Sequence, residues 1–503
     1  MPTVSFNQPA HFIQATQSSY SFLPFRFIDI DDKRVVVNEV GEYLFLSPED
    51  FERFVSRKLN RADGVYKDLQ SKHFLFDSEP EVPVKLLATK YRTKRGFLAG
   101  FTGLHIFVVT LRCDHSCHYC QVSRVSPDKA LFDMSQEAAS KAIDLALKSP
   151  SENIKIEFQG GEPLLNLPLI EFIINETKSR TSEKSRDIQF VITSNLATLN
   201  DETLEFLKKH DILLSTSLDG PDFIHNANRP RPGNDSYELT RLGIARAREA
   251  LGYDKVDALM TTSQLSLGYP TEIVDEYVSA GFSNISIRPI SPYGFATRSL
   301  AKTGYETEAF LDFYKKALAH IIELNRSGTY FIEMYAKLLL TKILTPYPTG
   351  YVDLQSPCGA GIGAAVYNYD GDVYVSDEAR MLAEMGDRSF RLGSVHKDTY
   401  EELFGGELLR TLVGSSCVES LPGCADCAFQ TYCGCDPIEN HATQGNIFGH
   451  RPTSNFCNRN MEIIKHLLRL YEGGDEFIRN LFWSWVQNTH MNELIPPLVT
   501  RGQ

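Results

Sequence analysis

The sequence predicts an α/β fold whose centre is a partial (β/α)6, TIM-like barrel. Three observations support this prediction. From Leu104 onward, apolar strand-like runs alternate with amphipathic helical stretches, which is typical of a parallel sheet with crossover helices. A block of shorter strands and helices, residues 1–80, precedes this region. Most of the ten cysteines gather in a third region, residues 358–457, and a chain of 503 residues is long enough for several domains.

Residues 1–80 are predicted to form a compact winged-helix-like module. Ser47 suits the start of a helix, because serine caps helix N-termini, Pro48 fits the first turn and the acidic residues after it favour the positive helix end. The expected strands are 22–27 and 34–38, and the expected helices begin at Ser47 and near Tyr66. We expect residues 81–103 to be a linker.

Residues 104–330 contain six strand-like runs separated by helical stretches, too few for a closed eight-fold barrel. The active site is expected at the carboxyl ends of the parallel strands. A bridging helix is expected in 331–357, a cysteine-rich domain in 358–460 and a helical tail in 461–503. The expected strands are 104–110, 154–158, 188–193, 212–218, 256–260 and 285–290, with helices at 135–148, 201–210, 237–251, 271–280 and 306–345.

The charge pattern bears on partners and location. A formal net charge of −13 argues against nucleic-acid binding, which needs a basic surface. The basic run Lys90–Arg95 is interpreted as a solvated helix face or linker. We see no secretory signal and no apolar run long enough for a membrane span, so a cytoplasmic location without a membrane partner is expected.

Cys113, Cys117 and Cys120 follow directly after the first barrel strand. Cysteines in a chain of this length without a secretory signal favour metal or cluster ligation over disulfides. Three thiolates on one loop can hold three irons of a 4Fe–4S cube and leave the fourth iron open. A four-ligand zinc site, completed by His115 or His118, is the alternative.

The spacing C-x3-C-x2-C at this place resembles the signature of the radical SAM superfamily, and later strand ends carry further resemblances. The resemblance implies a radical SAM barrel in which the open iron binds S-adenosylmethionine (SAM). Reductive cleavage of SAM then yields a 5′-deoxyadenosyl radical that removes a hydrogen atom from the substrate. For four of the residues named next, Ser194, Asn195, Ser217 and Arg229, the alternative is ordinary turn chemistry or a surface ion pair. The residues that the resemblance places against SAM are Tyr119, Gly160, Gly161, Glu162, Pro163, Ser194, Asn195, Ser217 and Arg229.

The later cysteines resemble the SPASM iron–sulfur domain of peptide-modifying radical SAM enzymes. That resemblance implies one auxiliary 4Fe–4S cluster, with zinc as the alternative, on Cys424, Cys427, Cys433 and Cys457. Ser376 stands where the family has a cysteine of another auxiliary cluster. The remaining cysteines are therefore interpreted as ligands of a second auxiliary cluster or as ordinary thiols: Cys358, Cys417 and Cys435.

The next residue, Asp377, matches the proton acceptor of anaerobic sulfatase-maturing relatives, with a solvated loop aspartate as the alternative. The N-terminal block resembles the peptide-recognition element of ribosomal-peptide maturases, which binds a leader peptide as an added strand. The N-terminal motifs and the length together resemble the His-Xaa-Ser system radical SAM maturase.

The resemblance implies a cytoplasmic oxidoreductase that crosslinks, epimerises or oxidises a ribosomally made precursor peptide. Its implied partners are that peptide with its leader, an electron donor such as flavodoxin or ferredoxin, and a second maturase of the same system. A sulfatase-type maturase that forms formylglycine and a non-catalytic metal-binding peptide scaffold are the alternatives.

Overall fold

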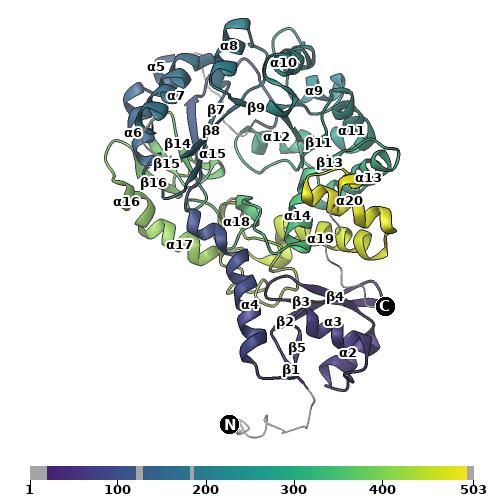
Figure 1. Cartoon of the computed structure of the whole chain (residues 1–503). Coiled ribbons are helices and arrows are strands. Elements are labelled where there is room, and N and C mark those ends of the chain that lie inside the picture. The colour runs from purple at the N-terminus through teal and green to yellow at the C-terminus, as the bar shows by residue number, and fades with distance from the viewer. Residues whose placement is uncertain (1–19, 121–128, 182–185, 495–503) are drawn as a thin grey trace.

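A nine-stranded sheet lies at the centre of the molecule (Figure 1). The computed structural model describes residues 20–120, 129–181 and 186–494. The six parallel strands of the barrel stand in the order β12-β10-β9-β8-β7-β6. They are β6 (Leu104–Thr110), β7 (Asn153–Gly160), β8 (Asp187–Thr193), β9 (Leu213–Ser217), β10 (Val256–Thr261) and β12 (Ile287–Arg288). The predicted α/β fold with a partial barrel is therefore confirmed.

Helices cover the outer side of this curved sheet (Figure 1). Each connects neighbouring parallel strands, as crossover connections require. Ile156 and Phe158 of β7 and Ile192 of β8 are fully buried in the core that results. The covering helices are α6 (Gln136–Ala146), α7 (Leu167–Thr181), α8 (Asp201–Lys209), α10 (Ser236–Leu251) and α11 (Pro270–Ser279).

The sixth expected strand is divided. Only β12 pairs with β10, whereas β11 (Asn284–Ile285) pairs with β13 (Ile332–Glu333). The helical stretch expected at 306–345 is divided at the same place, into α13 (Thr307–Arg326) and α14 (Met334–Leu344). A continuous apolar run does not show which partner each of its residues pairs with, so one strand was expected where two short ones form.

The cysteine-rich region extends the barrel sheet. β14 (Ala364–Tyr367) pairs in parallel with β6, and β15 (Asp372–Tyr374) and β16 (Arg391–Ser394) continue the sheet as antiparallel strands. The helices that follow are α15 (Asp377–Glu384), α16 (Tyr400–Gly405), α17 (Glu407–Ser416), α18 (Pro437–Gln444), α19 (Asn455–Gly473) and α20 (Glu476–Gln487). α19 packs on α13, and α20 packs on α14, at one side of the barrel (Figure 1).

The N-terminal module lies at one end of the molecule (Figure 1). It contains the antiparallel sheet β2 (Phe25–Ile30), β3 (Lys33–Asn38) and β4 (Tyr43–Leu46), a short pair formed by β1 (Ser21–Phe22) and β5 (Leu75–Phe76), and helices α2 (Pro48–Val55) and α3 (Gly64–Ser71). Ser47 caps α2 as expected, because its side chain accepts a hydrogen bond from the amide of Asp50 at 3.1 Å. The N-terminal module has a hydrophobic core of its own, which includes Val36, Phe54 and Leu69.

The expected linker is instead a helix, α4 (Glu81–Lys94), which runs from the module to the barrel (Figure 1). The reading of its basic end as a solvated face holds for the exposed Arg92 but not for Lys94. Lys94 is buried and donates to the carbonyls of Val40 and Lys342, at 3.0 and 3.1 Å. Burial lowers the pKa of Lys94 to about 7. A run of basic letters alone does not show which of them turns inward.

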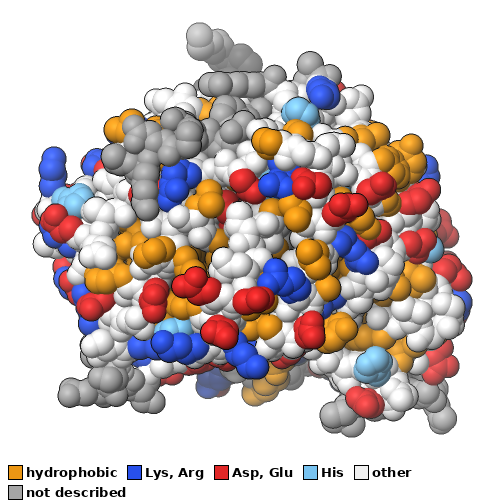
Figure 2. Space-filling view, turned by 90° about the horizontal axis from the view of Figure 1, so that it is seen from above, with side chains coloured by type: hydrophobic (Ala, Val, Ile, Leu, Met, Phe, Trp, Pro, Cys, Tyr) orange, Lys and Arg blue, Asp and Glu red, His pale blue; other side chains and the backbone are white. Residues whose placement is uncertain are grey.

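The surface carries no broad basic area in the view of Figure 2. Acidic, basic and apolar side chains are intermixed over the described part of that face, in keeping with a net charge of −13. Among the described residues, no helix combines the length and the apolar character that a membrane span requires.

Candidate active site

Four loops converge at the carboxyl ends of β6, β7, β8 and β9. The cysteine loop Cys113–Cys120 follows β6. Burial raises the pKa of Cys117 to about 11, and the neighbouring thiol of Cys120 raises it further, whereas Arg229 lowers it. Burial also raises the pKa of Cys113, and Cys117 adds to this effect. Cys117 thus lies within electrostatic reach of both other thiols, as is expected of three ligands of one centre.

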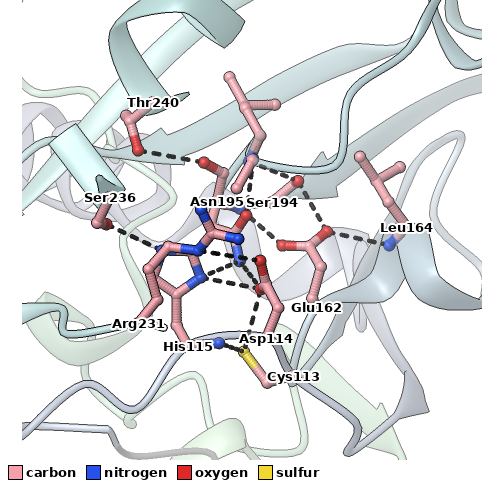
Figure 3. A network of polar contacts seen from close by, with 12 residues as sticks. Cys113, Asp114, His115, Glu162, Leu164, Ser194, Asn195, Arg231, Ser236 and Thr240 are labelled. Atoms are coloured by element: carbon pink, nitrogen blue, oxygen red, sulfur yellow. Dashed lines mark hydrogen bonds and ion pairs between the residues drawn. The ribbon is translucent and has the colours of Figure 1, made fainter. Parts of the chain in front are cut away.

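Glu162 lies behind the cysteine loop and has no exposed surface (Figure 3). Its carboxylate accepts hydrogen bonds from the hydroxyl of Ser194 at 2.8 Å and from the amides of Asn195 and Leu164, at 2.8 and 3.1 Å. Burial nevertheless raises its pKa to about 7. A cationic group bound beside Glu162 would offset this cost of burying its charge.

Asp114 and His115 are site residues that the sequence analysis did not place against a cofactor. The side-chain amide nitrogen of Asn195 donates to the carboxylate of Asp114 at 2.7 Å, and a ring nitrogen of His115 lies 2.9 Å from the same carboxylate (Figure 3). The second carboxylate oxygen of Asp114 and the Nε of Arg231 form a buried ion pair at 3.8 Å, and neither atom has a hydrogen-bond partner in the described part of the chain. The only signal for Asp114 and His115 in the sequence is their position inside the cysteine loop.

The zinc alternative would use His115 or His118 as the fourth ligand. Ligand atoms of Cys113, Asp114 and His115 do lie within 4.8 Å of one another. However, hydrogen bonds occupy both ring nitrogens of His115, one with Asp114 and the other with Ser236 at 2.9 Å. The Nε2 of His118 lies 3.3 Å from the ammonium group of Lys302. His115 would have to leave these contacts to bind a metal.

Tyr119, Asp219 and Arg229 form a second buried group on the same loop edge. The Tyr119 hydroxyl donates to the carboxylate of Asp219 and accepts from Arg229 at 3.0 Å. Asp219 has no exposed surface, and burial raises its pKa although Arg229 lowers it. Arg229 is therefore not a partner in a surface ion pair. Asp219 lies two residues after Ser217. The sequence alone does not identify it as a site residue, because a single buried carboxylate has no characteristic spacing to other residues.

The two glycines of the Gly160–Pro163 motif also have a packing role. A Cβ on Gly160 would lie 2.2 Å from the carbonyl oxygen of Thr110, and one on Gly161 would lie 2.2 Å from that of Arg112. β7 and β6 therefore approach too closely for any side chain here. Pro163 begins the short 3-10 helix Pro163–Asn166. Ser217 ends β9 and is half-buried.

The cysteines expected to hold an auxiliary cluster gather between the loop after α17 and the start of α19. Burial raises the pKa of Cys424, and the neighbouring thiols of Cys435, Cys457 and Cys427 contribute to the increase. Burial raises the pKa of Cys433, and the thiols of Cys457, Cys427 and Cys424 contribute. The structure thus places near one another the four residues that the SPASM resemblance names, Cys424, Cys427, Cys433 and Cys457, with Cys435 beside them.

The other three cysteines lie outside that set, and the amide of Cys358 donates to the hydroxyl of Ser416, the residue before Cys417, at 3.1 Å. Burial raises the pKa of Cys358, and Cys435 contributes to this. Cys435 has no exposed surface, and its sulfur accepts hydrogen bonds from Asn440 at 3.4 Å and Arg451 at 3.5 Å. The sulfur of Cys417 instead donates to the carbonyl of Val413 at 3.2 Å and lies in the wall of a separate cavity of about 720 Å³.

Ser376 and Asp377 begin helix α15. The side chain of Ser376 caps this helix by accepting from the amide of Ala379 at 3.2 Å. The serine thus has a structural task at the position where the family has a cysteine. Asp377 accepts a hydrogen bond at 3.1 Å from Arg380, whose side chain has no exposed surface. Asp377 is therefore not a freely solvated loop residue.

A comparison with known families identifies the converging loops. The model of the radical SAM superfamily matches residues 107–277, which include the cysteine loop, Glu162, Asn195 and Arg229. The chain contains a radical SAM domain. The domain implies a 4Fe–4S cluster and SAM, and the side chains fit them: three neighbouring thiols suit three irons, and the buried Glu162 suits a cationic amino group.

Several curated proteins are similar over part of the chain. An uncharacterized protein of Methanocaldococcus jannaschii is 32% identical over 37% of this chain and 62% of its own length. The radical SAM cyclopropyl synthase TigE of Paramaledivibacter caminithermalis is 25% identical over 36% of this chain and 40% of its own length. The chain thus spans less than two thirds of these two relatives. A cysteine-type anaerobic sulfatase-maturating enzyme of Clostridium novyi is 23% identical over 67% of this chain and 88% of its own length.

Two solved structures share the fold. Native anSMEcpe with bound AdoMet and the Cp18Cys peptide superposes with a TM-score of 0.61 at 19% identity, over 74% of this chain and 98% of its own. Streptococcus suis SuiB bound to the precursor peptide SuiA gives 0.50 at 14% identity, over 87% of this chain and 99% of its own. At these identities the similarity concerns the fold alone.

Proposed function

We propose that the protein is a radical SAM maturase that modifies a ribosomally made precursor peptide. The observation that carries the proposal is the combination of the radical SAM site with a separate N-terminal module docked against the cysteine-rich domain. When bound, the cluster and SAM would supply a carbon-centred radical for hydrogen-atom abstraction. Residues of this chain would orient SAM: Glu162 toward its amino group, and the Ser194–Asn195 segment and Arg229 toward its other polar groups.

The contacts of the N-terminal module support this proposal. Arg26 of β2 donates to the carbonyl of Ala425, within the Cys424–Cys427 loop. The hydroxyl of Tyr432 donates to the carbonyl of Gly41 at 2.7 Å. A peptide added to an edge of the sheet β2-β3-β4 would therefore be held close to the proposed auxiliary cluster. Backbone pairing of this kind is a common mode of peptide recognition.

The second candidate is a sulfatase-type maturase that oxidises one cysteine or serine to formylglycine. The extent of the match to the Clostridium novyi enzyme, 88% of that protein, favours it. In this reading Asp377 would accept the proton released during oxidation, and Arg380 would hold its carboxylate in place. The N-terminal module separates the two candidates, because a sulfatase-type reaction does not require a leader-binding domain.

Co-expression with a leader-bearing precursor peptide, sought among short reading frames beside the gene, tests the proposed function. We expect a mass change in that peptide, such as the loss of two hydrogens for a crosslink, and we expect removal of residues 1–80 to abolish it. Undiminished turnover of a leader-bearing peptide by the truncated protein would favour the sulfatase-type reaction. The control for the truncation is the full-length protein with Lys67→Ala, a change at an exposed position in the same module.

The cysteine assignments are tested separately. After anaerobic reconstitution with iron and sulfide, the triple change of Cys113, Cys117 and Cys120 to alanine should abolish formation of 5′-deoxyadenosine from SAM. Cys424→Ala should retain some SAM cleavage but lower the iron content and the product yield. Unchanged iron with zinc present in the purified protein would instead support the zinc alternative for the auxiliary site. SAM cleavage by the triple variant would overturn the assignment of the first cluster.

A further inference from the structure

A cavity of about 90 Å³ lies between the last barrel strand and the cysteine-rich domain. We call it the acidic chamber. Arg288, at the carboxyl end of β12, and Tyr335 of α14 line it on one side. Glu378 of α15 and Asp436 at the start of α18 line it on the other. The chamber therefore lies at the strand edge that carries the radical SAM site. It also lies next to Cys435, which precedes Asp436 in the chain.

Acidic groups outnumber basic groups in its wall. Four carboxylates line the chamber, against the guanidinium groups of Arg288 and Arg459. Within the described ranges, none of the six forms an ion pair within 4.0 Å, so the wall is not internally neutralised. The N-termini of α15 and α18 offset part of the charge of Glu378 and Asp436. The four carboxylates are those of Asp353, Glu378, Asp436 and Glu439.

The crowding of these carboxylates is unfavourable while the chamber holds no cation. Burial and then the like charges of Asp353 and Asp377 raise the pKa of Glu378 to about 7. Burial likewise raises the pKa of Glu439, and Asp353 contributes although Arg459 opposes it. A bound cation would relieve this repulsion, and the wall would gain a partner that it lacks.

An independent feature of the chamber also points to a ligand. Tyr293 is 2% exposed and lines the chamber, yet its hydroxyl has no hydrogen-bond partner among the described residues. Burial and then the charges of Asp436 and Glu439 raise its pKa. A buried hydroxyl without a partner is costly, and a ligand with N–H donors would satisfy it.

The size of the chamber limits what enters it. A volume of about 90 Å³ equals roughly three water molecules at about 30 Å³ each. That space accepts the charged end of a basic side chain but not a whole amino acid. Acidic walls, an unpartnered hydroxyl and this size together define a pocket for a small organic cation that donates several hydrogen bonds.

We propose that the acidic chamber binds the cationic side-chain end, a guanidinium or ammonium group, of a residue in the substrate peptide. Asp353, Glu378 and Glu439 provide the charge, and the Tyr293 hydroxyl accepts one of the N–H groups. Binding there holds the peptide at the strand ends, between the SAM site and the proposed auxiliary cluster. The assignment of the ligand to a peptide rests on the proposed function, whereas the preference for a cation does not.

Calorimetric titration of the anaerobically reconstituted full-length protein tests the preference. The probes are N-acetyl-arginine amide and N-acetyl-lysine amide, with N-acetyl-norleucine amide as the neutral control of similar length. We expect at least one cationic probe to bind tenfold or more tightly than the neutral one, and the preference to weaken as salt is added. The double variant Asp353→Asn/Glu378→Gln should lose the preference.

The matched control is Glu384→Gln, at the far end of the same helix α15 and outside the chamber, which should keep the preference. Glu439→Gln serves as a second chamber variant if the double variant does not fold, as judged by circular dichroism. Equal affinity for charged and neutral probes, or a preference that survives both chamber variants, overturns the proposal. A cation preference in a protein that leaves its co-expressed peptide unmodified would instead refute the proposed function and leave the chamber assignment intact.

Discussion

At the scale of single residues, the hydroxyl of Tyr119 joins two loops of the radical SAM domain. It donates to the buried carboxylate of Asp219, which follows β9, and accepts from Arg229 beyond it. The same tyrosine lies next to Cys120, the last thiol of the first cluster site. This one side chain thus couples the position of the cysteine loop to that of the loop after the fourth barrel strand.

Tyr119→Phe is expected to weaken SAM binding about tenfold in the reconstituted protein. The change leaves Asp219 without one of its donors, and an unsatisfied buried group costs about 1–3 kcal/mol, of which 1.4 kcal/mol equals a factor of ten in affinity. Equilibrium titration with SAM measures the effect. The control is Tyr253→Phe, since that ring is 71% exposed. Equal SAM affinity in the two variants would contradict the coupling of these loops.

Gly161→Ala tests the close approach of β7 to the cysteine loop. The added Cβ would overlap the carbonyl oxygen of Arg112, 2.2 Å away, so the backbone must move. Overpacking of this kind costs about 1–3 kcal/mol or more. We expect a lower melting temperature by circular dichroism and impaired cluster loading. Gly268→Ala, where nothing lies within 4 Å of the new atom, should melt like the unchanged protein. A Gly161 variant with unaltered melting would show that the strands can separate without cost.

At the scale of elements, the parallel pairing of β6 with β14 joins the barrel to the cysteine-rich domain. His105 of β6 has no exposed surface, and one of its ring nitrogens lies 3.2 Å from the hydroxyl of Tyr367 on β14. Burial lowers the pKa of His105 to about 4, and Arg186 contributes to the decrease. This histidine therefore stays neutral at the junction over the range in which an exposed histidine gains a proton.

This shift predicts a pH dependence of stability. In the unfolded chain His105 is protonated below about pH 6.5. In the folded protein it is protonated only near pH 4. Stability is therefore fully present above pH 6.5 and is lost as the pH falls toward 4, by on the order of 3 kcal/mol. His105→Phe should reduce the drop in melting temperature between pH 7 and pH 5, whereas replacing the exposed His450 with glutamine should not. An identical drop in all three proteins would refute the assignment.

The elements also show how far local pattern predicts structure. The strand 104–110 and the cap at Ser47 were predicted correctly, because their signals lie in adjacent residues. The division of the sixth strand, the helix α4 and the pairing of β14 with β6 were not predicted. Each depends on a pairing or packing partner that is far away in the chain. The periodicity of hydrophobic residues carries no information about that partner.

At the scale of the whole molecule, the N-terminal module contacts the cysteine-rich domain through few polar groups. Arg26 reaches the Cys424–Cys427 loop, Arg469 of α19 pairs with Asp31 at 2.9 Å, and Lys94 bridges the module to α14. The buried lysine and the loop contact are the strong members of this set, since exposed ion pairs contribute little.

Arg26→Ala is expected to loosen the module without disturbing the radical SAM site. Hydrogen exchange should rise in β2 and in the Cys424–Cys427 loop, because the carbonyl of Ala425 loses one of its two donors and keeps only Gln430 at 3.4 Å. SAM cleavage without peptide should stay within about twofold of the unchanged protein, while leader-dependent modification falls. Lys67→Ala, an exposed change on the same module, is the control. Unaltered exchange in both segments would mean that Arg26 does not hold the interface.

By itself, the sequence determined the class of fold, and it predicts the ligands of the first cluster site and the segments that surround SAM. Each of these follows from spacing along a short stretch of chain, such as Cys113–Cys120 or Gly160–Pro163. The tertiary structure alone decided that Glu162 and Asp219 are buried, that Cys358 lies beside the Ser416–Cys417 segment, and that four carboxylates and Tyr293 face one chamber. Burial and charge proximity arise between residues hundreds of positions apart, and they exist only once the elements have packed.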